Sequence, residues 1–252
     1  MTWLRIAFPS QAHVNPTRPI PHDFNHLGQP IGWVVPTWKA APFPRCEPLD
    51  GRFYRLEALD AARHGKSLWE VNTLDAEGRN WTYLPYGPFS SFDDYYRWIE
   101  ETLRDPTTLF YALIGRSTGQ PGVVAAYLNI DPANGAIEIG HLAYSPLLQR
   151  KPAATEAMFL MIERAFSLGY RRTVWKCNLL NAASRAAAER LGFSFEGIFR
   201  NAVIQNGRSR DTAWYSITEA EWPALQTGFL RWLDPANFDA TGRQKERLSV
   251  RR

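Results

Sequence analysis

Apolar residues recur along the chain with two different periods, and their succession predicts a mixed order of strands and helices. Runs rich in β-branched and aromatic residues predict strands over 52–59, 108–114, 123–130, 136–144, 173–177, 193–200 and 210–217. Apolar residues at helical spacing predict helices over 60–71, 91–103, 158–168, 182–191 and 223–232. From residue 52 the order is therefore βααβββαβαββ, followed by one more short helix.

Turn signals between these elements set their directions. The sequences STGQPG and DPANG join the three strands between 108 and 144 into an antiparallel meander, and QNGRS joins the last two strands into a hairpin. A strand–helix–strand step lies between these antiparallel parts. The pattern therefore predicts an α/β (α+β) fold, with a mixed, mostly antiparallel sheet and helices on both faces.

Helix caps support these boundaries. Ser91 followed by Asp94 resembles a capping box, and Asn181 is a good N-cap for the helix that begins at residue 182. Gly192 is placed to end that helix.

Composition along the chain changes twice and predicts three zones. Residues 1–46 are rich in proline and read as an N-terminal arm, although Trp33 and Trp38 are too apolar for an arm that stays free throughout. Residues 47–220 form one α/β domain, and residues 221–252 a short helix with a basic C-terminal tail.

The net charge of +4 comes from 29 Lys and Arg residues against 25 Asp and Glu residues. The last ten residues hold five basic residues and one acidic residue, so the whole excess lies in the tail. A basic tail on a neutral body predicts a solvated, frayed end and no nucleic-acid partner.

Hydrophobic residues make up 45% of the 252 residues, which is ordinary for a soluble globular protein. No apolar run approaches the roughly 20 residues that span a bilayer, and the N-terminus lacks an apolar signal segment. Cys46 and Cys177 are too few and too isolated for a disulfide framework or a zinc cluster. We therefore expect a cytoplasmic protein with free thiols, without a membrane partner and without a metal.

A basic turn follows the strand 136–144 and opens the next helix. It reads Gln149, Arg150, Lys151, Pro152, Ala153 and Ala154, and continues with Thr155, Glu156 and Ala157. About 25 residues later comes NAASRAAAERLGF. Over roughly residues 50–218 these motifs resemble the GNAT superfamily of acyl-coenzyme A N-acyltransferases. The nearest branch is that of the ribosomal-protein N-terminal acetyltransferases.

The resemblance implies that the turn 149–155 holds the pyrophosphate of coenzyme A (CoA) on backbone N–H groups at a helix N-terminus. The turn departs from the glycine-rich family pattern at two positions. Arg150 stands where many members have the first glycine, and Pro152, which has no N–H, replaces the central one. The side-chain charges of Arg150 and Lys151 offset that lost donor.

The second motif implies contacts with the pantetheine arm from Asn181 and Ser184. From the residues alone, Asn181 is an N-cap and Ser184 its polar partner, and the two roles are compatible. Many family members carry a tyrosine that protonates the leaving thiolate, but its position here is Ala188.

The strand AIEIGHLAY implies the other half of the site, with Leu142, Ala143 and Tyr144 pairing with pantetheine. Glu138 and His141 are its titratable residues and the candidate catalytic groups. Because strand side chains alternate, we expect these two on opposite faces, so that only one faces the acceptor amine. For each, a structural role stays open beside the catalytic one.

An aromatic turn over 81–89 precedes the second predicted helix. The resemblance implies that its residues Trp81, Tyr83 and Tyr86 line the acceptor pocket, and simple packing of a lid is the alternative.

Taken together, the resemblance implies an enzyme, an N-acetyltransferase that moves an acetyl group from acetyl-CoA to a primary amine by direct attack. The acceptor is a protein or peptide N-terminus, or alternatively a small amine such as a polyamine, amino acid or antibiotic. A CoA-binding sensor without catalysis is the alternative from a different class. A homodimer stays open.

Overall fold

The computed structural model describes residues 22–146, 148–149 and 151–250, and it forms two compact units, Met1–Lys39 and Ala40–Arg252. In the first unit, the described residues form two short antiparallel strands, β1 (His22–Phe24) and β2 (Pro30–Gly32). The second unit begins within the sequence zone assigned to the arm. There Ala41 donates its N–H to the Pro132 carbonyl (3.0 Å).

One eight-stranded sheet organises the second unit, in the order β3-β4-β5-β6-β7-β8-β10-β9. Its strands are β3 (Leu49–Asp50), β4 (Tyr54–Ala58), β5 (Leu109–Gly115), β6 (Pro121–Asp131), β7 (Ala136–Tyr144), β8 (Arg172–Asn178), β9 (Ser194–Gln205) and β10 (Arg208–Thr218). Neighbouring strands are antiparallel except β7 and β8, which are parallel. The predicted mixed, mostly antiparallel sheet is confirmed.

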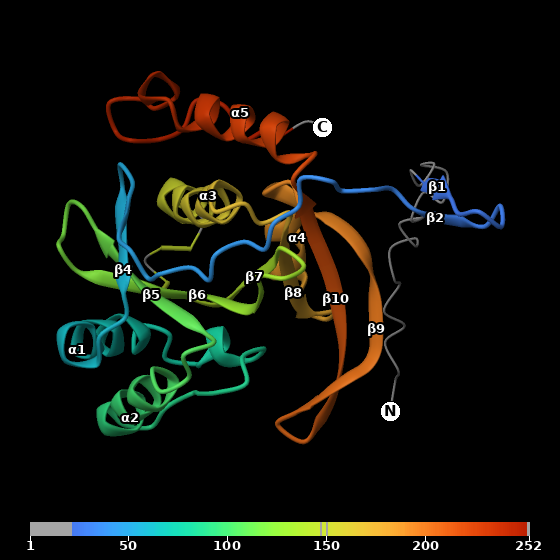
Figure 1. Cartoon of the computed structure of the whole chain (residues 1–252). Helices are drawn as coiled ribbons and strands as arrows, with labels where there is room; N and C mark the ends of the chain where they lie inside the picture. Colours follow the sequence, from blue (N-terminus) through green and yellow to red (C-terminus); the bar gives the residue numbers. More distant parts are fainter. Residues whose placement is uncertain (1–21, 147, 150, 251–252) are drawn as a thin grey trace, which may run out of the picture. The chain divides into compact units, whose positions relative to one another are not determined.

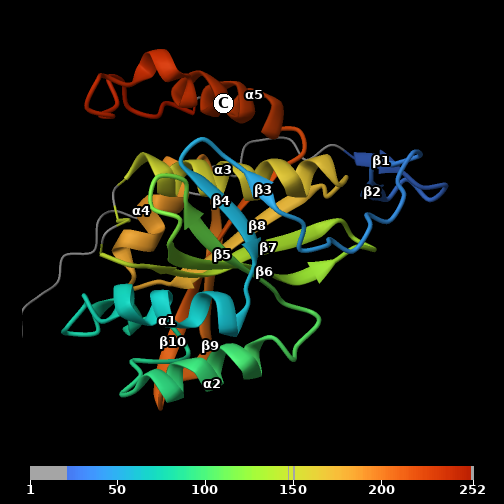
Figure 2. The same cartoon turned by 90° about the vertical axis from the view of Figure 1, so that its left-hand side faces the viewer.

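Helices cover both faces of this sheet (Figures 1 and 2). One face carries α1 (Ala61–Asn72) and α2 (Phe92–Thr102), joined through the short 3₁₀ helix η1 (Arg79–Trp81). The other face carries α3 (Pro152–Ser167) and α4 (Ala182–Arg190). Helix α5 (Trp222–Leu233) lies on the outer side of α3 and leads to the 3₁₀ helix η2 (Pro235–Asn237).

The predicted caps are confirmed in atomic detail. The Ser91 hydroxyl accepts the Asp94 N–H (3.1 Å), and the Asn181 side chain accepts the Ser184 N–H (3.0 Å). Gly192 adopts a φ of 92° after α4, a conformation that glycine reaches at least cost.

Two apolar clusters lie on opposite sides of the sheet. Ile137 and Ile139 of β7 pack with Met161 and its neighbours under α3. Phe110 and Ala143 belong to the second cluster, under α1 and α2. The central strands are therefore buried on both faces, which explains their almost continuous apolar sequences.

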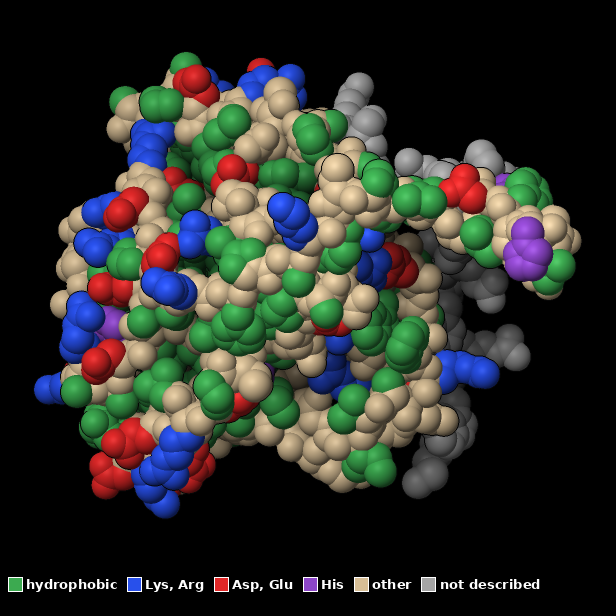
Figure 3. Space-filling model, in the orientation of Figure 1, with side chains coloured by type: hydrophobic (Ala, Val, Ile, Leu, Met, Phe, Trp, Pro, Cys, Tyr) green, Lys and Arg blue, Asp and Glu red, His purple; other side chains and the backbone are tan. Residues whose placement is uncertain are grey.

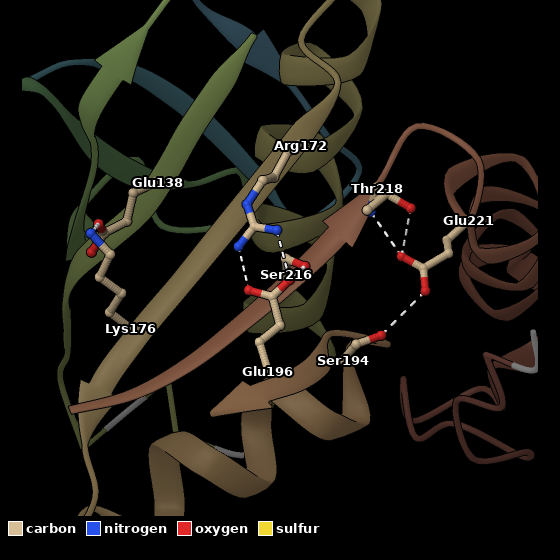
Figure 4. Close-up of polar contacts among 8 residues, drawn as sticks. All are labelled: Glu138, Arg172, Lys176, Ser194, Glu196, Ser216, Thr218 and Glu221. Atoms are coloured by element: carbon tan, nitrogen blue, oxygen red, sulfur yellow. Dashed lines mark hydrogen bonds and ion pairs between the residues drawn. The ribbon is translucent and has the colours of Figure 1, made fainter. Parts of the chain in front are cut away.

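Two carboxylates, those of Glu196 and Glu221, fix the hairpin of β9 and β10 beside β8 (Figure 4). Glu196 accepts from the Arg172 guanidinium and from the Ser216 hydroxyl (2.7 Å). Glu221, before α5, accepts from the Thr218 N–H (2.9 Å) and the Ser194 hydroxyl (3.2 Å). These contacts tie β9 to β8 and β10, and tie the start of α5 to both strands of the hairpin.

The frayed tail predicted from the sequence is wrong for the described part of the C-terminus. Residues 243–250 return along α5, and the Trp232 indole N–H donates to the Glu246 carbonyl (3.0 Å). Leu248 and Val250 pack against the core cluster under α3. These apolar contacts hold the segment in place. The prediction failed because it considered only the charge of the tail and not its apolar residues.

On the face of the second unit that Figure 3 shows, Lys and Arg side chains are interspersed with Asp and Glu. Among the described residues, no helix is long and apolar enough to cross a membrane.

Candidate active site

Strands β7 and β8 separate part-way along their length. Their parallel pairing covers Ala136, Ile137 and Glu138 of β7 and then stops. In the part of the chain that the structure describes, residues 139–144 have a strand partner only on the β6 side. Backbone N–H and C=O groups at such an edge can pair with an extended ligand, as an added strand would. The predicted pantetheine residues Leu142, Ala143 and Tyr144 lie along this edge.

A β-bulge interrupts β7 beside the point of separation. Gly140 pairs with Ala126, and Ala143 pairs with Val124. Between these two pairs, β7 therefore has one residue more than β6. His141 adopts a φ of 51°, which is uncommon for a residue other than glycine.

The bulge places Glu138 and His141 on the same face of the sheet, that of α1 and α2. Glu138 is in register with Leu128, and the His141 ring lies 4.9 Å from that of Phe110. The prediction that the two side chains point to opposite faces is wrong, because strict alternation requires an unbroken ladder.

Glu138 is held by two donors. Its Oε2 accepts from Asn129 Nδ2 (2.7 Å) and pairs with Lys176 Nζ (2.7 Å), as Figure 4 shows for Lys176. The Lys176 ammonium also lies 4.0 Å from the centre of the Trp214 ring. A side chain on Gly140 would stand 3.7 Å from Glu138 Oε1, so the glycine leaves room beside that oxygen.

His141 lies against the aromatic turn. Its Nδ1 is 3.1 Å from the Tyr86 hydroxyl, and the two rings stack with centroids 5.6 Å apart. Burial lowers the pKa of His141 and raises that of Tyr86. The imidazole is therefore neutral near pH 7, the form that can accept a proton.

The aromatic turn is tied across the same face of the sheet. Trp81 is buried and contacts Tyr86 edge-on (6.1 Å between centroids). The Tyr83 hydroxyl donates to the Leu180 carbonyl (3.2 Å), and Gln205 Nε2 donates to the Leu84 carbonyl (2.9 Å). The turn thus faces the site from α1–α2 and contacts both β9 and the segment before α4.

The turn before α3 leads from the end of β7 to the helix on the other face of the sheet. Lys151 occupies the N-cap position without a side-chain cap, and Pro152 is the first helical residue. Gln149 Nε2 donates to Asn80 Oδ1 (2.7 Å) and to the Tyr144 carbonyl (3.2 Å), so this side chain braces the turn. Arg150, also predicted to bind CoA, lies outside the described residues.

Helix α4 ends beside the first turn of α3, where Arg190 Nη1 donates to Thr155 Oγ1 (3.0 Å). Asn181 caps the N-terminus of α4, and the Ser184 hydroxyl accepts the Trp175 indole N–H (3.0 Å). Ala188 is completely buried in the core, so its position offers no acid to a leaving group. Contacts of Asn181 and Ser184 with pantetheine stay predictions.

Comparison with known proteins assigns this arrangement to a family. The family model of the acetyltransferase (GNAT) domain matches residues 57–194. The chain belongs to the GNAT acetyltransferase family.

Individual relatives agree with the GNAT assignment. The chain is 42% identical to a GCN5-related N-acetyltransferase from Brucella melitensis, over 84% of this chain and 96% of that one, with a TM-score of 0.82. A GNAT-family structure from Chromobacterium violaceum is 39% identical over 78% and 98%, with a TM-score of 0.73. The "Putative ribosomal N-acetyltransferase YdaF" of Bacillus subtilis is 34% identical over 95 residues. That match spans 37% of this chain and about half (51%) of the relative.

Two side chains near the candidate site escaped the sequence analysis. Lys176 stands in the strand sequence TVWKC, where a charged residue among buried ones signals an ion pair. Arg190 of α4 donates from Nη1 to Thr155 Oγ1 (3.0 Å) in the first turn of α3. In the sequence, Arg190 stands out only by its place in ERLGF, directly after Glu189, at the end of the motif that resembles the family.

We expect the partly buried His141 to make stability depend on pH. Because its pKa is lowered in the folded state, the unfolded chain takes up a proton first as pH falls through about 6.5. The free energy of unfolding should therefore fall below pH 6.5, by at most about 1.4 kcal/mol per pH unit for this residue. Urea unfolding at pH 7.5 and pH 5.5 should show a smaller pH effect in His141→Gln than in the wild type. Equal pH effects would contradict this.

Proposed function

We propose that the chain transfers an acetyl group from acetyl-CoA to the α-amine of a polypeptide N-terminus. One observation carries the proposal: β7 leaves β8 directly after Glu138. The opening has the α3 N-terminus on one face of the sheet, and Glu138, His141 and the aromatic turn on the other. A thioester reaching through the opening would meet an amine from the opposite face.

The residues on the α3 face fit CoA. The free edge over 139–144 is extended backbone that suits the amide-bearing pantetheine arm. The N-terminus of α3 carries no side-chain cap, so its positive end suits a pyrophosphate. We propose Leu142, Ala143 and Tyr144 for the arm, with Gln149 bracing the turn that leads to α3.

The residues on the opposite face handle the amine and its proton. Acetyl-CoA supplies a thioester carbonyl, at which a C–N bond to the amine forms and the C–S bond breaks. Glu138 Oε1, beside Gly140, holds the incoming ammonium and receives its proton. Neutral His141 is the second acceptor on this face. Trp81, Tyr83 and Tyr86 form the aromatic wall of the acceptor site.

An α-amine is the acceptor that this weak base can serve. Its unperturbed pKa is about 7.7–8.0, against about 10.4 for a lysine side chain, so much of it is already neutral near pH 7.5. The ion pair with Lys176 occupies Glu138 Oε2 (2.7 Å), so Oε1 is the oxygen left for the amine. The Bacillus subtilis relative is named "Putative ribosomal N-acetyltransferase YdaF", which supports a protein acceptor.

A small amine is the second candidate. The bonds from Tyr83 to Leu180 and from Gln205 to Leu84 tie the aromatic turn across the acceptor face. Such a closed wall favours a compact acceptor over a chain that must leave the site.

A turnover screen separates these acceptors. The full chain is incubated with acetyl-CoA, and free thiol is measured with tetrapeptides that have free N-termini. Blocked tetrapeptides that contain lysine, and spermidine, are the comparison acceptors. We expect free N-termini to turn over fastest. Faster turnover of spermidine would show that the acceptor is a small amine and not a peptide. CoA binding without turnover on any acceptor would contradict the proposal that the chain is an enzyme.

A further inference from the structure

The first turn of α3 presents few backbone donors. Its first residue, Pro152, has no N–H, and the Ala154 N–H already donates to the Lys151 carbonyl (3.1 Å). A pyrophosphate bound here would therefore find fewer amides than a glycine-rich turn offers. Side-chain donors must supply the remainder if the anion is to be held.

Arg190 brings a guanidinium to this turn from a separate helix. It is the last residue of α4, and its Nη1 donates to Thr155 Oγ1 (3.0 Å) in the first turn of α3. The Arg190 charge also lies close enough to Tyr144 to oppose the rise in the pKa of Tyr144 that burial causes. The guanidinium therefore stands between the end of β7 and the start of α3.

The charges at this place are unbalanced. No carboxylate pairs with Arg190 among the residues that the structure describes. The N-terminus of α3 is itself the positive end of a 16-residue helix. Two positive groups side by side are stabilised by an anion that contacts both. Arg190 is an exposed residue, while burial at this place lowers the pKa of its guanidinium, and Thr155 accepts one of its N–H groups.

We propose that Arg190 is a phosphate-binding residue, whose guanidinium holds the pyrophosphate of CoA and replaces the donor lost at Pro152. The inference rests on the proposed function, since it concerns the same cosubstrate. Thr155 positions Arg190 by accepting one of its five N–H groups, which leaves the others for phosphate oxygens.

Calorimetric titration of the full chain tests this with three ligands: CoA, dephospho-CoA, which lacks the 3′-phosphate, and pantetheine, which has no phosphate. Arg190→Gln should weaken CoA and dephospho-CoA equally, by roughly 10- to 100-fold, and leave pantetheine unchanged. Arg190→Lys keeps the positive charge but lacks the planar guanidinium with its paired N–H groups, so it should lose less CoA affinity than Arg190→Gln. Arg208→Gln, which removes an exposed arginine at the start of β10, is the matched control and should change nothing.

Three results would overturn the assignment: unchanged affinities in Arg190→Gln, a loss confined to CoA, or an equal loss for pantetheine. The second would place the guanidinium on the 3′-phosphate, and the third would reflect general damage to the site. Far-ultraviolet circular dichroism checks that each variant is folded. Failure of the wild-type chain to bind CoA at all would instead contradict the proposed function.

Discussion

Replacing Glu156 by alanine is expected to lower the free energy of unfolding by about 3–5 kcal/mol. The Glu156 side chain is buried in the first turns of α3. Its carboxylate accepts three consecutive backbone N–H groups, from Arg52 (2.6 Å), Phe53 (2.7 Å) and Tyr54 (3.1 Å). Alanine would leave these partly buried donors without their charged acceptor.

The turn is shaped around this carboxylate. A side chain on Gly51 would stand 2.5 Å from Glu156 Oε2, so the backbone approaches the carboxylate as closely as only glycine permits. The contact joins the turn between β3 and β4 to α3. Its loss therefore loosens the edge of the sheet as well as the helix.

Urea denaturation of the wild type and Glu156→Ala measures this effect. Glu100→Ala removes an exposed glutamate from α2 and is the matched control, with an expected change below about 0.5 kcal/mol. If both variants lost the same free energy of unfolding, the three hydrogen bonds to Glu156 would contribute no net stability, since water would replace them equally well.

Glu138→Gln is expected to reduce kcat/KM for a peptide acceptor by about 10²-fold while CoA affinity stays nearly unchanged. Glutamine keeps the shape of the side chain but cannot take the proton of the ammonium. The acceptor face then lacks its carboxylate, and the CoA contacts proposed on the α3 face are untouched. Steady-state kinetics with a free tetrapeptide and calorimetry with CoA measure the two quantities.

Lys176 supplies the control for this variant. Glu138→Gln also leaves the Lys176 ammonium without its partner, which alone could disturb the site. The double variant Glu138→Gln, Lys176→Met removes both charges and relieves that disturbance. If Glu138 acts as the base, the double variant stays as slow as the single one. Recovery of activity in the double variant would show that Glu138 serves only to neutralise Lys176.

The order of elements and the helix caps could be predicted because both are local. Apolar periodicity and the side chains of Ser91 and Asn181 act within a few residues of one another. The mixed sheet followed from the strand–helix–strand step between β7 and β8. The family resemblance then predicted a site around that step.

What could not be predicted depends on partners far away in the sequence. The bulge at His141 shows only as a register shift against β6, and it reverses the expected face of that side chain. The bond from Arg190 to Thr155 joins two helices that are 35 residues apart at these positions. The tail looked solvated because its basic residues outnumber Leu248 and Val250, yet those two determine how it packs.

The central claim is tested most directly by locating the acetyl group on a product. A peptide with a free N-terminal α-amine and one internal lysine is incubated with acetyl-CoA and the full chain, and tandem mass spectrometry assigns the modified nitrogen. Acetylation of the α-amine, with the lysine unmodified, is the predicted result. Acetylation of the lysine, or an unmodified peptide under conditions where acetyl-CoA binds, would contradict the account.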